Sequence, residues 1–424
     1  MKKMLSAALA GVLALSLAAC GGSSAPATTA APAAPAAETK AEETKAAEAK
    51  AEETKAEETK AEAAPAAEGA VWKIGGMGPV TGPAAVYGAA TQQGQELAAK
   101  EINEAGGING YQIEVNYQDD EHDAEKAINA YNSLKDWGMQ MLVGATTSAP
   151  TIAVGAEAAN DNMFILTPSG TALEITEPRN VFRVCFSDPA QGTKSAEYIG
   201  GHDLPKKVAA IYDSSDVYSS GIHDAFIAEA ANQGIEVVAD EQYTGDSNTD
   251  FSTQIQKFKD AGAELVFLPI YYSDASKILT QAKQLGFETK YFGCDGMDGI
   301  LNVENFDTSL AEGLMLLTPF SADAEDELTR NFVKNYEAAY GGTPIQFAAD
   351  SYDGMFQLKA ALEAGNADPS MSASEICDIL VEQMPKIKIE HGLTGEDMTF
   401  TEEGEPNKAP KAVVIEGGVY KSIE

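Results

Sequence analysis

Residues 163–174 read MFILTPSGTALE, and this stretch combines the two features that decide the fold. Its first four residues are a continuous apolar run, which predicts a strand buried on both faces. The next five, TPSGT, end that strand in small polar side chains and a glycine before a helical pattern resumes. A buried strand, a short polar loop and a helix form the repeating unit of a parallel α/β sheet.

The same unit recurs on both sides of this stretch. Upstream, we predict strands at 71–75, 111–117 and 139–144, and helices at 88–107, 123–137 and from about 150. Downstream, we predict strands at 207–212, 235–239, 264–270 and 290–293, and helices at 220–233, 251–261 and 274–285. The remainder is predicted to hold helices at 324–340 and 346–364, a third from a capping box at 372–375, and short strands near 397–400, 411–416 and 418–422. Two such runs predict an α/β fold with two parallel sheets.

The first 68 residues have a different composition. Residues 1–20 carry two lysines, an apolar stretch too short to span a bilayer, and small residues before Cys20, which indicates an export signal. Its ending, LAAC, resembles a bacterial lipobox, so Cys20 is the predicted site of lipid attachment; an ordinary signal with an incidental cysteine is the alternative. Residues 21–68 lack large apolar side chains, which predicts a disordered Ala/Pro/Glu/Lys tether.

Charge and cysteine content exclude several classes of protein. Residues 69–424 hold 55 acidic and 22 basic side chains, a balance that opposes binding to nucleic acid and adhesion to anionic lipid. Besides Cys20 only three cysteines occur, so at most one disulfide could form. The four histidines lack zinc-ligand spacing, and we expect no metal, no cofactor and no catalytic triad.

Two strand exits in the first half share an unusual composition. LVGATTSAPT (142–151) places Thr146, Thr147 and Ser148 between a strand and a helix, and ILTPSGTALE (165–174) places Ser169, Gly170 and Thr171 in the corresponding loop. The unpaired N–H groups and the dipole of a helix N-terminus favour an anion. Each hydroxyl taken singly is explained by helix capping. Two such loops on neighbouring strands favour a carboxylate site.

The second half offers complementary groups after its own strands. Tyr218 follows the strand at 207–212, Tyr271 follows 264–270 and Asp295 follows 290–293. An aspartate suits an ammonium group, and tyrosines supply apolar walls with a hydroxyl. A plain turn at Asp295 and partial burial of the tyrosines are the alternative explanations.

From about residue 70 to the end, the chain resembles the leucine/isoleucine/valine-binding family of type I solute-binding proteins, which serve ABC importers. The resemblance rests on the order and spacing of GPVTGPAAVYGAATQQGQELAAKEINEAGGING, LVGATTSAPT, ILTPSGTALE, DSSDVYSSG and FGCDGMDG. It implies two Rossmann-like lobes with parallel sheets, joined by three hinge crossovers, that close on an α-amino acid. It implies lobes at 70–187 plus 321–393 and at 188–320 plus 394–424, with hinges near Phe186–Pro189, Thr318–Ser321 and Gly392–Thr399.

The resemblance also implies roles for individual residues. Ser148 and Thr171 would bind the ligand carboxylate; the Ser169 carbonyl, the Thr171 hydroxyl and Asp295 would bind the ammonium. Tyr218 and Tyr271 would approach from the second lobe, and the side-chain pocket would be shaped by Tyr87, Thr146, Thr147 and Phe347. Asp295 is shorter than the glutamate often found there. His122 and Thr147 occupy positions where some members have a disulfide.

The resulting hypothesis is a monomeric, lipid-anchored, extracytoplasmic binding protein. It would deliver an amino acid, branched-chain or otherwise aliphatic, to permease and ATPase subunits on separate chains. A sensory lipoprotein of the same fold, reading a small carboxylate or amide, is the main alternative. A structural lipoprotein is another. A nicotinamide enzyme is disfavoured, because GGMGPVTG (75–82) falls one residue short of the dinucleotide fingerprint.

Overall fold

The computed structural model describes residues 69–423. The predicted signal, Cys20 and the tether lie outside these residues, so those predictions stay untested. Within residues 69–423, no helix is both long and apolar enough to cross a membrane.

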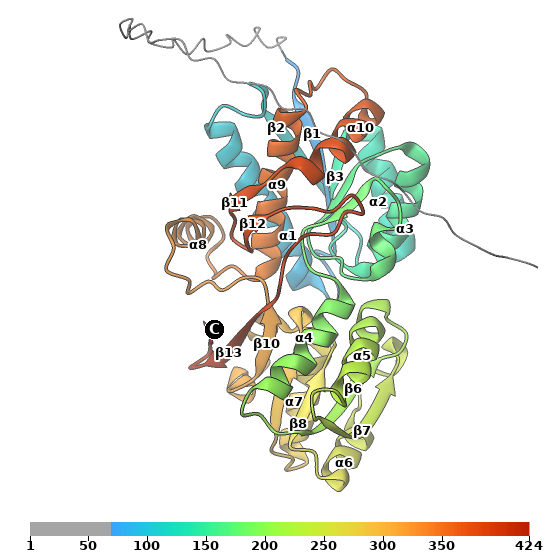
Figure 1. The fold of residues 1–424 in the computed structure, drawn as a ribbon, viewed down its shortest axis with the longest axis vertical. Helices are drawn as coiled ribbons and strands as arrows, with labels where there is room; N and C mark the ends of the chain where they lie inside the picture. The colour runs from blue at the N-terminus through green and yellow to red at the C-terminus, as the bar shows by residue number, and fades with distance from the viewer. Residues whose placement is uncertain (1–68, 424) are drawn as a thin grey trace, which may run out of the picture. The chain divides into compact units, whose positions relative to one another are not determined.

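The first sheet contains five strands in the order β2-β1-β3-β4-β5, and all neighbouring pairs are parallel (Figure 1). The strands are β1 Trp72–Gly78, β2 Ile113–Asp119, β3 Met141–Val143, β4 Ile165–Thr167 and β5 Val181–Arg183. The helices packed around this sheet are α1 Ala85–Glu104, α2 Ala124–Trp137, α3 Ser148–Asp161, α8 Glu327–Tyr340, α9 Gln346–Ala364 and α10 Ala373–Gln383. We call this sheet with these helices the first lobe.

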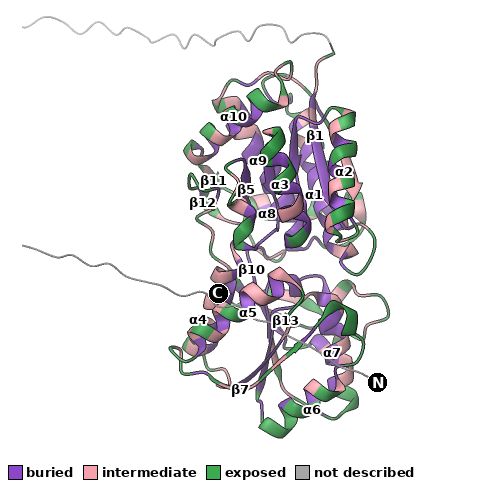
Figure 2. Cartoon of the chain, turned by 90° about the vertical axis from the view of Figure 1, so that its right-hand side faces the viewer, coloured by how far each residue is buried: buried purple, intermediate pink, exposed green. Residues whose placement is uncertain are grey.

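Alternation along the strands divides the first lobe's interior between the two faces of the sheet. Met141 and Val143 of β3 pack with the cluster that contains α1 and α9, whereas Leu142 packs with the cluster that contains α2 and α3. All three side chains are at most 1% exposed, and Figure 2 shows the strands buried beneath helices with exposed outer faces. Helices on both faces require apolar residues at every strand position, which explains continuous runs such as MFIL.

The second sheet has seven strands in the order β14-β13-β10-β9-β8-β6-β7. The strands are β6 Lys207–Asp213, β7 Glu236–Tyr243, β8 Leu265–Leu268, β9 Lys290–Gly293, β10 Met315–Thr318, β13 Lys411–Glu416 and β14 Val419–Ser422. Its helices are α4 Asp188–Gly201, α5 Val217–Ala230, α6 Ser252–Ala261 and α7 Tyr272–Gln284. We call this sheet with these helices the second lobe.

The predicted parallel sheets are confirmed, except that one edge of the second-lobe sheet is antiparallel. β13 pairs antiparallel with β10, and β14 pairs antiparallel with β13. The reason is local, because β13 and β14 form a hairpin around Gly417 and Gly418, both at positive φ, and a hairpin returns antiparallel.

Some elements were not predicted. These are β5, α4 and β11 Ile389–His391; β11 forms a two-stranded ribbon with β12 Glu396–Met398, which overlaps the strand predicted near 397–400. The short 3₁₀ helices are η1 Leu173–Thr176, η2 Gly245–Ser247, η3 Asp295–Met297, η4 Ile300–Asn302, η5 Thr308–Ala311 and η6 Met384–Lys386. The predicted helix boundaries are otherwise close to those observed, and the capping box of Ser372 and Glu375 is confirmed.

The chain passes between the two sheets three times: after β5, after β10 and before β13. The segment before the third crossing remains with the first lobe, because the Gly404 carbonyl accepts from the Arg183 N–H at 3.1 Å. Lys408 bonds Asp350 of α9 at 3.2 Å. These contacts favour placing the last lobe boundary after Lys408, whereas the sequence analysis placed it between residues 393 and 394. The lobe boundaries remain a proposal.

Helices α1 and α9 approach so closely that only glycine fits between them. A Cβ on Gly94 of α1 would lie 2.1 Å from the Ala348 carbonyl oxygen of α9. We expect Gly94→Ala to lower the free energy of unfolding by about 1–3 kcal/mol, because the backbones must separate. Urea unfolding measures the change. Gly201→Ala is the matched control, since nothing lies within 4 Å of its added Cβ in α4; equal effects would contradict the packing argument.

Candidate ligand-binding site

The two polar loops of the first lobe lie against each other. The backbone N–H groups of Thr171 and Ala172 donate to the Ser148 hydroxyl oxygen at 3.2 and 3.3 Å. The Ser169 hydroxyl donates to the Thr146 carbonyl at 2.6 Å. Parallel neighbouring strands β3 and β4 bring these loops to the same sheet edge, as the sequence predicted.

Two hydroxyl groups in these loops keep unused hydrogen-bonding capacity. Ser148 accepts two N–H bonds, which leaves its own proton free to donate. The Thr171 side chain is buried, and its oxygen has no hydrogen-bond partner of good geometry. Ser148 is the first residue of α3, so its hydroxyl lies at the positive end of that helix. The second loop ends in the four-residue 3₁₀ helix η1, so only the first loop precedes a long helix.

Thr146 and Thr147 direct their hydroxyls elsewhere. The Thr146 hydroxyl lies 2.9 Å from that of Thr91 and donates to the Met77 carbonyl at 3.2 Å, so it is occupied within the first lobe. Thr147 is the residue that caps α3 by position, but its side chain makes no capping bond. Its oxygen instead lies 2.9 Å from His122 Nδ1. A hydrogen bond therefore links the two positions where some relatives were expected to have a disulfide.

Asp295 is the acidic residue of a second-lobe group that also contains Tyr218, Tyr271 and Gly296. Its Oδ1 accepts from the Tyr218 hydroxyl and from the Gly296 N–H, both at 2.8 Å, and its own N–H donates to the Gln191 side chain at 3.1 Å. The aspartate is 2% exposed and begins the 3₁₀ helix η3. The plain-turn explanation fails, because a turn residue has no need to bury its carboxylate among these donors.

The environment of Asp295 shifts its ionisation. Burial raises its pKa to about 6, and the bonds from Tyr218, Gln191 and Gly296 oppose that rise. The carboxylate therefore remains mostly ionised at neutral pH, and the groups that donate hydrogen bonds to it, the Tyr218 hydroxyl and the Gly296 N–H, carry no positive charge. Such a group gains from a nearby cation.

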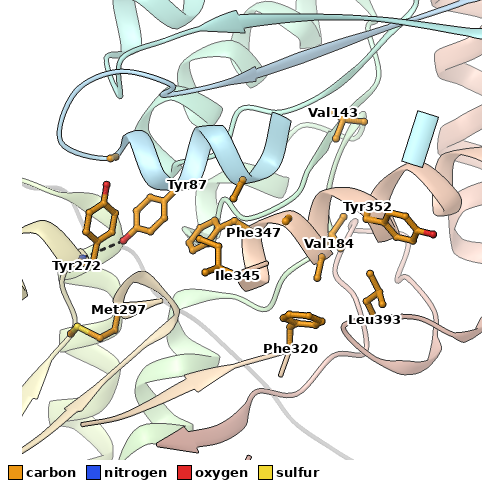
Figure 3. Packing of buried hydrophobic residues seen from close by; sticks show 14 of the residues in the cluster. Tyr87, Val143, Val184, Tyr272, Met297, Phe320, Ile345, Phe347, Tyr352 and Leu393 are labelled. Carbon is orange, nitrogen blue, oxygen red and sulfur yellow. Dashed lines mark hydrogen bonds between the residues drawn. The ribbon is translucent and has the colours of Figure 1, made fainter. Parts of the chain in front are cut away.

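Aromatic side chains connect the two lobes. Tyr87 of α1 stacks on Phe347 of α9 with ring centroids 4.1 Å apart, and its hydroxyl donates to the Gly296 carbonyl of the second lobe. The Tyr272 N–H in turn donates to the Tyr87 hydroxyl at 3.3 Å (Figure 3). The Tyr271 ring stacks on Tyr218 with centroids 4.8 Å apart, and it makes an edge contact with Tyr87 at a centroid distance of 5.6 Å.

The structure gathers the predicted residues into two groups: Ser148, Ser169 and Thr171 in the adjacent first-lobe loops, and Tyr218, Tyr271 and Asp295 in the second lobe. Tyr87 of the first lobe contacts second-lobe residues directly and Phe347 stacks on Tyr87, whereas the Thr146 hydroxyl is turned toward Thr91. Gln191 and Asp188 of α4 were missed, because α4 itself was missed. Within residues 69–423, no three His, Cys, Asp or Glu side chains are grouped to hold a metal.

Comparisons with known proteins agree with this geometry. The family model for periplasmic binding proteins matches residues 71–417. The chain is 30% identical over 348 residues to the Leu/Ile/Val-binding protein homolog 1 of Brucella abortus, covering 80% of this chain and 89% of that protein. It is 29% identical over 307 residues to the leucine-, isoleucine-, valine-, threonine- and alanine-binding protein of Pseudomonas aeruginosa, covering 72% and 81%.

A solved structure shares the whole architecture. The branched-chain amino acid transporter substrate-binding protein LivJ of Streptococcus pneumoniae, in complex with isoleucine, superimposes with a TM-score of 0.75 at 29% identity, covering 83% of this chain and 98% of that one. Two α/β lobes with a buried polar region between them define a binding protein of the hinged, two-lobed class. The chain belongs to the periplasmic binding protein family.

Proposed function

We propose that this protein binds an α-amino acid, branched-chain or otherwise aliphatic, between its lobes and delivers it to an ABC importer. One observation carries the proposal: Asp295 is buried in the second lobe with uncharged hydrogen-bond donors, while the adjacent first-lobe loops hold the unsatisfied Thr171 hydroxyl and a Ser148 hydroxyl whose proton is free to donate. These groups match the two charged ends of a zwitterion. The names of the relatives in Brucella, Pseudomonas and Streptococcus support an amino acid as the ligand.

In this proposal each end of the ligand has its own partners. The carboxylate accepts from the Ser148 hydroxyl and from N–H groups at the start of α3. The ammonium donates to Asp295, to the Thr171 hydroxyl and to the Ser169 carbonyl. Tyr87 and Phe347 supply an apolar wall for the side chain, and Tyr218 and Tyr271 close the site from the second lobe. A few charge-assisted bonds of about 1.5–3 kcal/mol each are consistent with roughly micromolar affinity.

The remaining parts of the proposal concern the cell envelope. Membership of the family supports an extracytoplasmic location. The LAAC sequence supports a lipid on Cys20 as the anchor, with residues 21–68 as a tether. Permease and ATPase subunits are the proposed partners, on separate chains, and the protein is proposed to act as a monomer without enzymatic activity.

Calorimetry on the protein, stripped of bound ligand by unfolding and refolding, tests the proposal with each of the twenty amino acids. We expect micromolar or tighter binding of at least one aliphatic amino acid, and much weaker binding of its des-amino analogue. Binding of simple carboxylates with no preference for the ammonium group would favour the sensory alternative. No binding of any amino acid would contradict the proposal.

Affinity should depend on pH through Asp295. A bound ammonium favours the ionised carboxylate, so binding lowers the Asp295 pKa from about 6. The association constant should therefore be highest above pH 6 and fall about tenfold per pH unit below it. Titrations between pH 5 and 8 measure this, and Asp295→Asn should flatten the profile. If the association constant of Asp295→Asn still fell with pH as in the wild type, the pH dependence would belong to Asp298 or Asp188, whose pKa values burial also raises.

A further inference from the structure

Beside Thr171 lies a buried carboxylate that the proposed function does not use. Asp188 is the first residue of α4, where the chain enters the second lobe (Figure 1). It is 1% exposed, and neither carboxylate oxygen has a hydrogen-bond partner of good geometry. Its backbone N–H donates to the Thr171 carbonyl at 2.9 Å, which fixes the two residues next to each other.

The surroundings of Asp188 are tightly packed. A Cβ on Gly221 of α5 would lie 3.0 Å from Asp188 Oδ2, so the helix backbone covers the carboxylate. Arg183 is the cation that acts on it, but that guanidinium pairs with Glu405 at 2.9 Å. Asp295 and Asp216 add negative charge. Burial raises the Asp188 pKa well above its usual value, and the Thr171 hydroxyl opposes that rise.

A buried acid left in this state requires an explanation, since unsatisfied buried carboxylates are destabilising. Capping explains little, because the cap residue of α4 is Ser187 and the structure shows no side-chain cap bond there. The Thr171 hydroxyl and the Asp188 carboxylate are neighbouring buried groups that act on each other, and neither has a hydrogen-bond partner of good geometry. A function shared between them would account for both.

The chemistry of the ligand's ammonium supplies that function. An ammonium group only donates hydrogen bonds, so a threonine oxygen that receives one must direct its own proton to a different acceptor. Without such an acceptor, the threonine hydroxyl proton could point toward the ammonium group and block the hydrogen bond that the ammonium donates to the threonine oxygen. The Asp188 carboxylate is the unsatisfied acceptor beside Thr171.

We propose that Asp188 is a positioning residue whose carboxylate accepts the Thr171 hydroxyl proton in the ligand complex and so holds the threonine oxygen as an acceptor for the ligand's ammonium. Asp188 then selects amino acids over the same acids without an amino group. The inference rests on the proposed function and deepens it, because it assigns part of the ligand preference to a residue that does not touch the ligand.

A double-mutant cycle tests the inference with L-leucine and its des-amino analogue 4-methylpentanoate as probes. We expect Asp188→Ala to weaken leucine binding about tenfold and to leave 4-methylpentanoate binding unchanged, because only leucine carries an ammonium. Asp188→Asn keeps a neutral acceptor and should restore most of the loss. In a Thr171→Val background, which removes the hydroxyl, Asp188→Ala should have no further effect on leucine.

The outcomes separate a positioning role from a structural one. Equal weakening of both probes, or additive effects of the two substitutions, would overturn the inference by making Asp188 a structural residue. Leucine binding that is normal in both Asp188 variants would overturn it while leaving the proposed function intact. A wild-type protein that binds no leucine would contradict both. If Asp188→Ala does not fold, Asp188→Leu, which has a similar size and cannot accept a hydrogen bond, replaces it in the cycle and must show coupling to Thr171→Val for leucine alone.

Discussion

Asp295→Asn should weaken binding of the amino acid about 10- to 150-fold, the largest effect on affinity that we expect from a single conservative substitution. The change keeps the shape of the side chain and an oxygen that can accept from Tyr218 and Gly296. It removes only the negative charge. A hydrogen bond to a charged group contributes about 1.5–3 kcal/mol, which corresponds to this range of affinities. Calorimetry with the amino acid bound most tightly by the wild type measures the loss.

The same substitution should not destabilise the ligand-free protein. A carboxyl whose pKa in the folded state is raised, as for Asp295, lowers stability at every pH above its unfolded value. Replacing it with an amide relieves that penalty at pH 7, so the ligand-free melting temperature should be equal or higher. Asp260→Asn, an exposed residue of α6, is the matched control and should leave affinity unchanged. Wild-type affinity in Asp295→Asn would place the ammonium elsewhere.

The fold could be predicted from sequence because its signals are local and repeated. A strand covered by helices on both faces must be apolar at successive positions, as Met141, Leu142 and Val143 are, and each run ends in polar or glycine residues. The elements that escaped prediction lack these signals. β5 is three residues long, and α4 carries Gly192 and Gly200 with weak apolar periodicity. Glycine at 192 is required by packing, since a Cβ there would lie 2.3 Å from the Ile222 carbonyl oxygen.

The candidate site was predictable by composition but not by orientation. Loops rich in Thr and Ser identified the sheet edge, yet they did not reveal that the Thr146 hydroxyl turns toward Thr91. Side-chain direction depends on partners distant in sequence, which no local pattern encodes. Asp188 was missed for the same reason, because Ser187-Asp188-Pro189 reads as an ordinary helix start. Only tertiary packing shows that its carboxylate is buried without a hydrogen-bond partner of good geometry.

The largest effect on stability should come from the segment before the third crossing. Lys408 and Asp350 form an ion pair at 3.2 Å in which both side chains are 1% exposed. The lysine also donates to the Thr394 hydroxyl, which in turn donates to Asp353 at 2.6 Å. These bonds attach residues 394–408 to α9 in the first lobe.

Lys408→Met should lower the free energy of unfolding by about 3–5 kcal/mol, because it leaves the Asp350 carboxylate buried without its cation. The Asp350 pKa is already raised to about 7 by burial, and Lys408 holds it down; the variant raises it further. Since a raised acid pKa lowers stability above the unfolded value, the deficit should be larger at pH 8 than at pH 5. Urea unfolding at both values measures it. Lys421→Met, whose pair with Glu416 is about half exposed, should change stability by less than about 1 kcal/mol.

Replacing both partners separates the charge from the packing. Lys408→Met combined with Asp350→Leu removes the uncompensated carboxylate and fills the space with apolar atoms, so most of the lost stability should return and its pH dependence should disappear. A double variant as unstable as the single one would mean that Lys408 acts through Thr394 and Asp353 rather than through Asp350. If Lys408→Met alone kept wild-type stability at pH 8, Asp350 would have to be uncharged at that pH. The contact between Asp350 and Lys408 would then be a hydrogen bond to a neutral acid, and it would contribute little to holding residues 394–408 on α9.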